Sequence, residues 1–162
     1  MKTFNGEGRE TKQVDYAAIA PEAVGMLLGL TRQVEQAGIE PSLLELIRTR
    51  SSQMNGCAYC VDMHTKDARQ AGESEQRLYA LTAWRETPFF SRRERAALAW
   101  AEAVTRLGLG PFPEHLADEV REEFSDHDLV YLTLAVVAIN GWNRLAIPLG
   151  AAVGSYTPRV RG

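Results

Sequence analysis

Glycine and proline residues divide this chain of 162 residues into segments that each carry a helical apolar pattern. β-Branched residues are not gathered into alternating runs, so no strand is predicted. The loops between segments are short, which favours antiparallel helices packed around one core. The sequence therefore predicts an all-α fold of about six to eight helices. Residues 15–154 are expected to form a single domain between a polar N-terminal segment, 1–14, and a C-terminal tail, 155–162.

Local start and stop signals set the expected limits of the helices. The run from Ser91 to Glu94 fits the Ser-x-x-Glu capping box, which marks the beginning of one helix. Gly56 ends the helix before the two cysteines, and Gly72 ends the helix that follows it. The expected helices span about 15–36, 41–54, 57–70, 73–87, 91–107 and 114–123, with a long apolar helix after Ser125.

The stretch from Leu129 to Gly154 is apolar enough to raise the question of a membrane span. Asn140, Asn143 and Arg144 fall in its middle, and a charged residue near the centre of a bilayer costs about +2.5 to +3.5 kcal/mol. We therefore predict a buried helix and no membrane contact. A helix that is apolar on nearly all sides needs cover all round, which favours a homo-oligomer. The three polar side chains are expected to form hydrogen bonds between subunits.

Composition argues against several kinds of partner. The chain has 18 Lys and Arg against 21 Asp and Glu, a net charge of −3, and its arginines are scattered rather than gathered into a stripe. No nucleic-acid partner is therefore predicted. The N-terminus is polar and lacks the apolar core of a secretory signal, so the expected location is the cytoplasm. No metal, nucleotide or flavin motif is visible, and no cofactor is predicted.

Both cysteines of the chain, Cys57 and Cys60, lie in one short run with His64. Positions i, i+3 and i+7 are neighbours along one side of a helix, so the two thiols and the imidazole are expected to form a row. In a reducing compartment a Cys-x-x-Cys pair is more often catalytic or metal-binding than structural. Two thiols within disulfide reach and a nearby base predict a redox centre.

The residues alone do not identify the attacking thiol. The N-terminal end of the helix favours a negative charge near Cys57, whereas His64, one turn after Cys60, can act as the base for Cys60. A zinc site is an alternative, because Cys-x-x-Cys and a histidine supply three ligands, although a closed structural site needs four. Two buried cysteines without a chemical role are the remaining alternative.

A histidine base is usually oriented by a carboxylate on its other ring nitrogen. The candidates are Glu45, Asp62 and Asp67, and Asp62 is expected to point away from the face that carries Cys60. Glu45 lies in an apolar run, where an unpaired carboxylate would be costly. On local pattern alone, a solvated face of an amphipathic helix stays open as the reading of Glu45.

The position of Glu45, twelve residues before Cys57 (57 − 45 = 12), completes a pattern of Glu, Cys-x-x-Cys and His. This pattern resembles the alkylhydroperoxidase D (AhpD) family, within the carboxymuconolactone decarboxylase superfamily. The runs 65–69, 83–88 and 139–144 also resemble the peroxidase-like branch, and the resemblance covers about 40–148. It implies an AhpD-like helical domain with the Cys-x-x-Cys pair at the N-terminus of an inner helix, assembled as a trimer or hexamer.

The resemblance also implies a role for each residue of the pattern. Cys60 becomes a sulfenic acid, Cys57 resolves it to a disulfide, and Glu45 with His64 forms a proton relay. The implied function is a thiol-dependent peroxidase, with a peroxide as substrate and a dithiol protein or small dithiol as reductant. The alternatives are a non-catalytic redox sensor, a general dithiol oxidoreductase and a lactone decarboxylase, whose reaction does not need two cysteines.

Tyr59 departs from the family, whose best-known members carry a histidine immediately before the second cysteine. Its hydroxyl has an ordinary pKa near 10 and is a poor base at neutral pH, but it can donate a hydrogen bond. Tyr59 is therefore a candidate contact to the substrate or the relay, with simple packing as the alternative. The residues expected in the core or an interface are Trp84, Trp100, Phe124 and Trp142. The arginines expected at the surface are Arg48, Arg50, Arg92 and Arg93.

Overall fold

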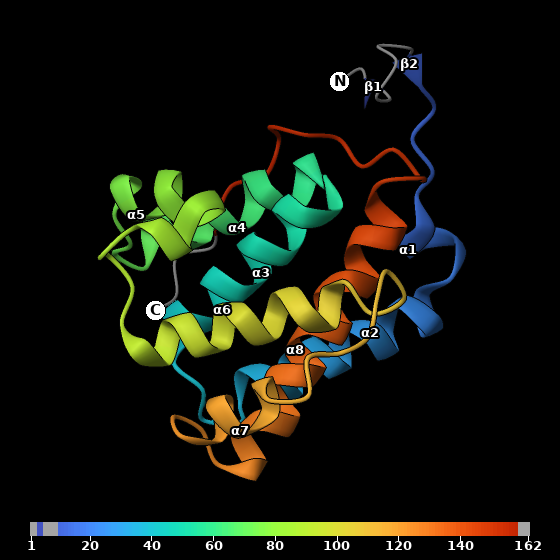
Figure 1. The fold of residues 1–162 in the computed structure, drawn as a ribbon. Helices are drawn as coiled ribbons and strands as arrows, with labels where there is room; N and C mark the ends of the chain where they lie inside the picture. The colour runs from blue at the N-terminus through green and yellow to red at the C-terminus, as the bar shows by residue number, and fades with distance from the viewer. Residues whose placement is uncertain (1–2, 5–9, 159–162) are drawn as a thin grey trace.

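The structure, a computed structural model, describes residues 3–4 and 10–158, so the expected segments 1–14 and 155–162 lie partly outside the described residues. The described chain forms eight α-helices and one 3-10 helix (Figure 1), which confirms the predicted all-α class and helix number. The elements in chain order are β1 (Thr3–Phe4), β2 (Glu10–Thr11), α1 (Tyr16–Ile19), α2 (Pro21–Glu35), α3 (Pro41–Asn55), α4 (Ala58–Gln70), α5 (Glu75–Ala80), η1 (Leu81–Glu86), α6 (Arg92–Thr105), α7 (Leu116–Arg121) and α8 (Asp126–Ala146).

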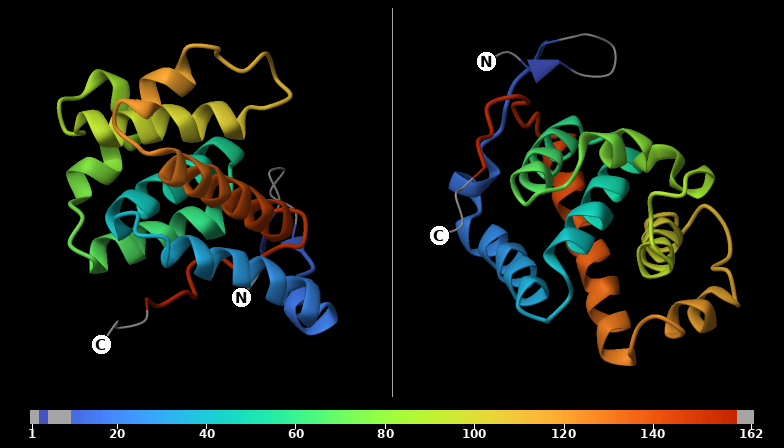
Figure 2. Two further views of the ribbon diagram at one scale, coloured as in Figure 1. Left: turned by 90° about the horizontal axis from the view of Figure 1, so that it is seen from below. Right: turned by 90° about the vertical axis from the view of Figure 1, so that its left-hand side faces the viewer.

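The helices α3 and α8 form the centre of the domain. Helices α4 and α6 pack against both of them, and α2 packs along α8 (Figure 2). Leu44 and Ile47 on α3, and Leu132 and Val136 on α8, are fully buried between these layers. By length and composition α8 could span a membrane. In this fold one part of its apolar side chains builds the core, whereas Val130 and Val137 are exposed.

Several element boundaries differ from the predicted ones. The first helix is broken, because α1 ends at Ile19 and Pro21, which has no N–H to donate, starts α2. The segment after Ser74 is also divided, into α5 and η1, and Ala83 has a non-helical backbone inside η1. The capping box of Ser91 and Glu94 is confirmed at the start of α6. The described strands, two residues each, pair antiparallel where none was predicted.

The polar groups of α8 find their partners within the chain. The Asn55 side-chain amide donates to Oδ1 of Asn140 at 2.7 Å and of Asn143 at 2.8 Å. The amide of Asn143 donates to Ser52 Oγ at 3.1 Å, and Arg144 donates to Asn140. These bonds lie within one chain, because the polar end of α3 lies against α8, and they satisfy the fully buried Asn143 without a second subunit. For Asn140 and Arg144, hydrogen bonds between subunits stay a prediction. The bonds from Asn140 and Asn143 hold Asn55 directly before the turn that leads to Cys57.

Candidate functional site

The two cysteines lie where α3 turns into α4. Gly56 takes a left-handed conformation, φ +70°, which ends α3 and reverses the chain. Cys57 caps α4 rather than starting it, and its Sγ accepts a hydrogen bond from the Cys60 N–H at 3.4 Å. The two sulfurs are joined as a disulfide, with Cα atoms 5.3 Å apart. The structure thus brings the predicted thiol pair together at the N-terminus of an inner helix.

Both cysteines are buried against α8. Each is 1% exposed, and they form a small apolar cluster with Ile139 and Ala146 of that helix, against which Trp142 packs. Asn55, which precedes the turn at Gly56, forms the hydrogen bonds to α8 described above. The disulfide is therefore fixed by three helices, α3, α4 and α8.

His64 lies on α4 and is bound by Glu45 from α3. The distance from His64 Nδ1 to Glu45 Oε2 is 2.8 Å, and the two side chains are only 9% and 8% exposed. Glu45 is therefore not on a solvated helix face. The other two candidate carboxylates bind elsewhere, since Asp62 accepts from Lys66 and Asp67 accepts from Tyr156. Of the three, Glu45 is the one that orients the imidazole.

A buried arginine extends this pair. Arg48 Nη1 donates to Glu45 Oε1 at 2.7 Å, and Arg48 Nη2 lies 3.2 Å from Glu35 Oε1. Arg48 is 6% exposed, so its expected place at the surface is wrong. Burial raises the pKa of Glu45, but the hydrogen bonds and charges of His64 and Arg48 outweigh burial and lower the pKa below its ordinary value.

The lowered pKa of Glu45 decides which ring nitrogen of His64 donates a hydrogen bond to it. A carboxylate that is ionised at neutral pH can only accept a hydrogen bond, so His64 Nδ1 carries the proton toward Glu45. In the neutral ring the Nε2 atom then has a free lone pair. No partner for Nε2 lies in the described part of the chain. The ring can therefore take up a proton through Nε2.

Cys60 and His64 line one cavity of about 470 Å³, whereas Cys57 does not. Tyr59, the residue that departs from the family pattern, also lines it. So does Trp142, which was expected in the core or an interface, whereas Trp84, Trp100 and Phe124 are buried as predicted. Most of the remaining wall is apolar and comes from α2 and α8: Leu28, Val34, Ala135, Ala138, Ile139 and Ala146. The cavity therefore borders Cys60 but not Cys57.

Two further tyrosines of the cavity were missed in the sequence because they lie outside every motif. Tyr16 comes from α1, and Tyr156 comes from the segment after α8. The Tyr156 hydroxyl donates to Asp67 at 2.8 Å, and Lys66 holds the Tyr156 carbonyl at 3.1 Å. Burial, this hydrogen bond and the charge of Asp67 raise the pKa of Tyr156 to about 12. The chain after α8 is therefore part of the cavity wall.

Donor atoms of Glu45, His64 and Asp67 lie within 4.8 Å of one another, close enough for one metal ion. This set contains neither cysteine, so it is not the zinc site considered from the sequence. The guanidinium of Arg48, 2.7 Å from Glu45, opposes a second cation at the same carboxylate. The three groups therefore suit proton transfer better than metal binding.

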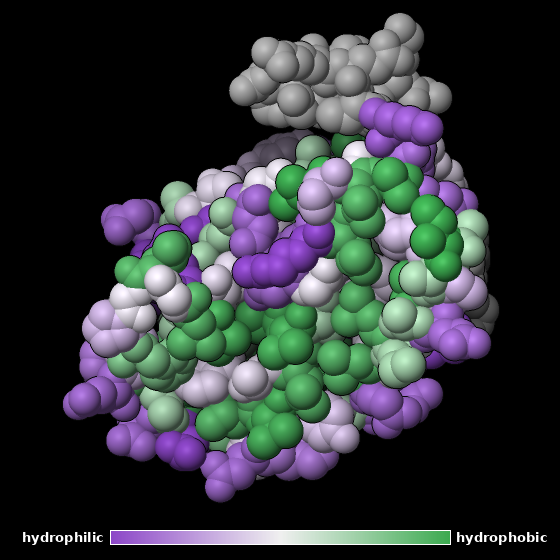
Figure 3. All heavy atoms as spheres, turned by 90° about the vertical axis from the view of Figure 1, so that its right-hand side faces the viewer, coloured by the Kyte–Doolittle hydropathy of each residue, from purple (hydrophilic) through white to green (hydrophobic). Residues whose placement is uncertain are grey.

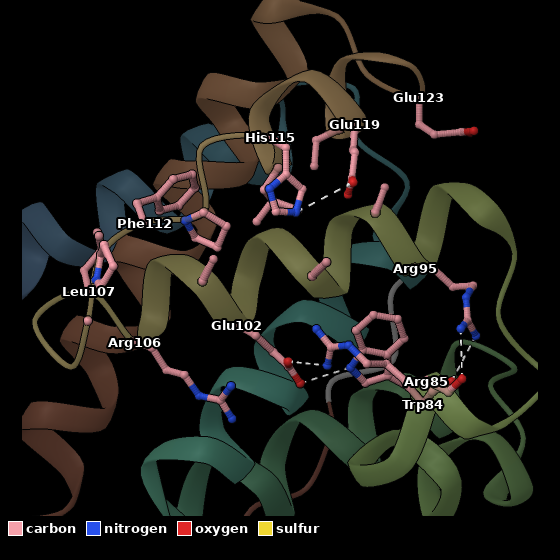
Figure 4. Close-up of a pocket in the computed structure, with 18 of the residues that line it drawn as sticks. Trp84, Arg85, Arg95, Glu102, Arg106, Leu107, Phe112, His115, Glu119 and Glu123 are labelled. Atoms are coloured by element: carbon pink, nitrogen blue, oxygen red, sulfur yellow. Dashed lines mark hydrogen bonds and ion pairs between the residues drawn. The ribbon is translucent and has the colours of Figure 1, made fainter.

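A second cavity, of about 780 Å³, lies between η1, α6 and the loop before α7. Figure 4 shows Glu102 pointing toward Trp84 and Arg85, which donate to its carboxylate. Arg50 Nε also donates to the Glu102 carboxylate, at 2.7 Å. This carboxylate is saturated by its neighbours, and neither cysteine lines the cavity. The larger cavity therefore offers no redox chemistry.

Two known proteins resemble this chain in sequence over most of its length. The chain is 42% identical over 145 residues to the uncharacterized protein YdfG of Bacillus subtilis, covering 90% of this chain and 99% of that protein. It is 27% identical to the uncharacterized protein YnjA of Escherichia coli over 80% of this chain and 68% of that one. Neither relative has an assigned activity in its name.

Solved structures share the fold. A protein of unknown function from Agrobacterium tumefaciens, named in relation to the antioxidant defence protein AhpD, matches with a TM-score of 0.86 and 38% identity over 90% of this chain and all of that one. The debrominase Bmp8 matches with a TM-score of 0.76 and 20% identity over 85% of this chain and 74% of that one. Residues 21–103, which include both cysteines, match the carboxymuconolactone decarboxylase family. The chain is therefore an AhpD-like member of the carboxymuconolactone decarboxylase family.

Proposed function

We propose that this protein is a thiol-dependent peroxidase that uses Cys60 as the attacking thiol. The observation that carries the proposal is that Cys60, bonded to Cys57, lines the same cavity as an imidazole whose Nδ1 is bound to Glu45. This arrangement supports Cys60 over Cys57 as the attacking thiol, because Cys60 lines the cavity and Cys57 does not. Tyr59 lies beside the attacking sulfur.

The proposed reaction begins with the reduced pair. His64 Nε2 takes the proton of the Cys60 thiol, and the thiolate attacks the terminal oxygen of a hydroperoxide. The O–O bond breaks, Cys60 becomes a sulfenic acid, and the alkoxide takes the proton back from His64 to leave as an alcohol. The Cys57 thiol then displaces water from the sulfenic acid and closes the disulfide. An external dithiol reduces the disulfide and is itself oxidised to a disulfide.

The balance of one cycle is one hydroperoxide and one dithiol converted to one alcohol, one water and one disulfide. A reducing cytoplasm supplies such dithiols, as a protein or a small molecule. Buried sulfurs favour this controlled exchange, because the sulfenic acid meets Cys57 before it meets a second oxidant. The proposed cycle needs no metal and no organic cofactor.

Turnover with dithiothreitol tests the proposal. The parent should consume many equivalents of cumene hydroperoxide per protein. After reduction and removal of dithiothreitol, Cys57→Ser should consume one equivalent and hold a sulfenic acid that dimedone traps. With dithiothreitol present, Cys60→Ser should lose at least ~10³-fold in rate. The chain has only these two cysteines, so the double variant is a thiol-free blank. Consumption of a single equivalent by the parent would indicate a redox sensor, and turnover by Cys60→Ser at the parent rate would refute the assigned thiol.

Reductive removal of bromide from an aromatic ring is a second candidate. The reaction converts an aryl bromide and the dithiol to the arene, hydrogen bromide and the disulfide, so it uses the same two thiols. The aromatic side chains of Tyr16, Tyr59 and Trp142 along the cavity favour a flat ring as ligand. Bromide release from a brominated pyrrole, measured against hydroperoxide turnover at equal concentration, separates the two candidates.

We also propose that the protein assembles with copies of itself. Side chains of Ile19, Met26, Val130 and Val137 on α1, α2 and α8 are 49–74% exposed. Figure 3 shows hydrophobic surface gathered over the side of the molecule that these helices form. An apolar face of this kind is typical of a subunit contact. A trimer or hexamer is the expected state.

A further inference from the structure

The described residues that line the cavity beside Cys60 offer a substrate no free cation. Among the described residues that line it, the one guanidinium is Arg48, and both of its Nη atoms already face carboxylates, those of Glu45 and Glu35. His64 gives its Nδ1 to Glu45. Asp67 is a third carboxylate in the wall and accepts from Tyr156. Among these described residues carboxylates outnumber guanidinium groups, so a carboxylate that entered would meet like charge and no unpaired cation.

The polar groups still open to a ligand are uncharged. Tyr16 and Tyr59 both line the cavity, and the hydroxyl of neither has a hydrogen-bond partner in the described part of the chain. Each hydroxyl can donate to a peroxide or alcohol oxygen. Burial is the main cause that raises the pKa of Tyr16, followed by the nearby Tyr59 hydroxyl, so this group stays a donor at neutral pH.

From these observations we infer that the cavity selects uncharged organic hydroperoxides and excludes those that bear a carboxylate. In this proposal the apolar walls from α2 and α8 pack against the organic group, and the hydroxyls of Tyr16 and Tyr59 donate hydrogen bonds to the peroxide oxygens. Glu35, at the end of α2 and 37% exposed, is the group that engages Arg48 and so denies it to an anion. This inference rests on the proposed peroxidase function for its reactive group.

Ligand binding to the reduced parent protein tests the inference without turnover. The probes are 2-phenyl-2-propanol, the alcohol formed from cumene hydroperoxide, and its para-carboxylate, which has the same skeleton with one negative charge. Calorimetry should show affinity for the neutral alcohol at least about tenfold higher than for the carboxylate. Equal affinities, a preference for the carboxylate, or no measurable binding of either would overturn the inference. Loss of hydroperoxide turnover would instead refute only the proposed function.

Two variants assign the selection to residues. Glu35→Gln frees one face of Arg48, and the ratio of the two affinities should fall about threefold or more. Glu22→Gln removes the same charge from an exposed position on the same helix that does not line the cavity, and it should leave the ratio unchanged. Tyr59→Phe should weaken the binding of the alcohol a few-fold. It should not weaken the binding of isopropylbenzene, which has no oxygen to accept a hydrogen bond. Equal effects of Glu35→Gln and Glu22→Gln would overturn the role of Glu35.

Discussion

The carboxylate of Glu45 and the imidazole of His64 meet at 2.8 Å although 19 residues separate them in the chain. Two different helices supply them, and both side chains are buried. A carboxylate in this position holds the ring by its Nδ1 and stabilises the charge that forms when Nε2 takes a proton. Arg48, on the far oxygen, keeps that carboxylate ionised.

The first prediction concerns catalysis by this pair. In Glu45→Gln the amide has the same shape but no charge, and it can donate to Nδ1, which favours the imidazole form that cannot accept a proton at Nε2. Hydroperoxide turnover should fall by roughly 10²-fold or more. Circular dichroism should show an intact fold. Turnover within threefold of the parent would remove Glu45 from the relay.

The second prediction concerns stability and pH. Burial raises the pKa of Glu45, but His64 and Arg48 lower it by more, so the pKa in the folded protein lies below the ordinary 4.5. A carboxyl whose pKa is lowered by folding stabilises the fold at pH values above its ordinary pKa. This stabilisation disappears as the pH falls through the pKa of the folded protein. Urea unfolding at pH 7 should show the parent more stable than Glu45→Gln by about 2–4 kcal/mol. The difference should shrink near pH 3.5.

The exposed carboxylate of Glu22 supplies the control for the pH effect. Glu22→Gln removes one negative charge without touching the pair, so its free energy of unfolding should follow the parent at both pH values within about 0.5 kcal/mol. A Glu45→Gln difference that stayed constant from pH 7 to pH 3.5 would contradict the lowered pKa.

The third prediction concerns Tyr156. Burial and the contact with Asp67 raise the pKa of Tyr156 from the ordinary 10.0 to about 12. The contact therefore stabilises the fold at pH values below 10.0, and this stabilisation is lost as the pH rises through about 12. Absorbance at 295 nm should show one tyrosine ionising near pH 12. Tyr156→Phe should remove that component and Tyr131→Phe should not. Persistence of the component in Tyr156→Phe would place Tyr156 outside the wall.

Much of the helical frame could be predicted because its signals are local. The capping box at Ser91 and the left-handed glycine at Gly56 act over three or four residues, and both are found where the sequence placed them. Cys60 and His64 could be selected from their spacing along one helix, whereas Glu45 is selected through the resemblance to the AhpD family, because its local pattern also allows a solvated face. In the fold the short turn between α3 and α4 places Glu45 beside His64.

The residues that could not be predicted are those brought in by distant chain segments. Tyr16 and Tyr156 reach the cavity from opposite ends of the chain, and no periodic pattern marks either of them. The sequence predicts Arg48 at the surface, because arginines usually lie there. Only the tertiary fold shows that it is buried between Glu45 and Glu35. Pairing with two carboxylates is what makes the burial of its charge tolerable.

The fourth prediction concerns the polar contact between α3 and α8. Asn143 is fully buried and bonds both Asn55 and Ser52. Asn143→Ala leaves the buried Ser52 hydroxyl without this partner and removes one of the two acceptors of Asn55, so it should lower the free energy of unfolding by about 1–3 kcal/mol. Gln76→Ala, at an exposed position of α5, should change it by no more than about 0.5 kcal/mol. A loss below about 1 kcal/mol in Asn143→Ala would show that the network is dispensable.

The fifth prediction concerns assembly through the apolar face of α2 and α8. The chain mass is 18.0 kDa, and light scattering of the parent should give three or six times that value. Val137, 49% exposed on α8, should be covered in the assembly, so Val137→Glu buries an unpaired charge and should give a monomer. Tyr79→Glu is the control, because Tyr79 is 73% exposed on α5, away from α2 and α8 (Figure 1). A monomeric parent, or an unchanged mass in Val137→Glu, would show that this face does not join subunits.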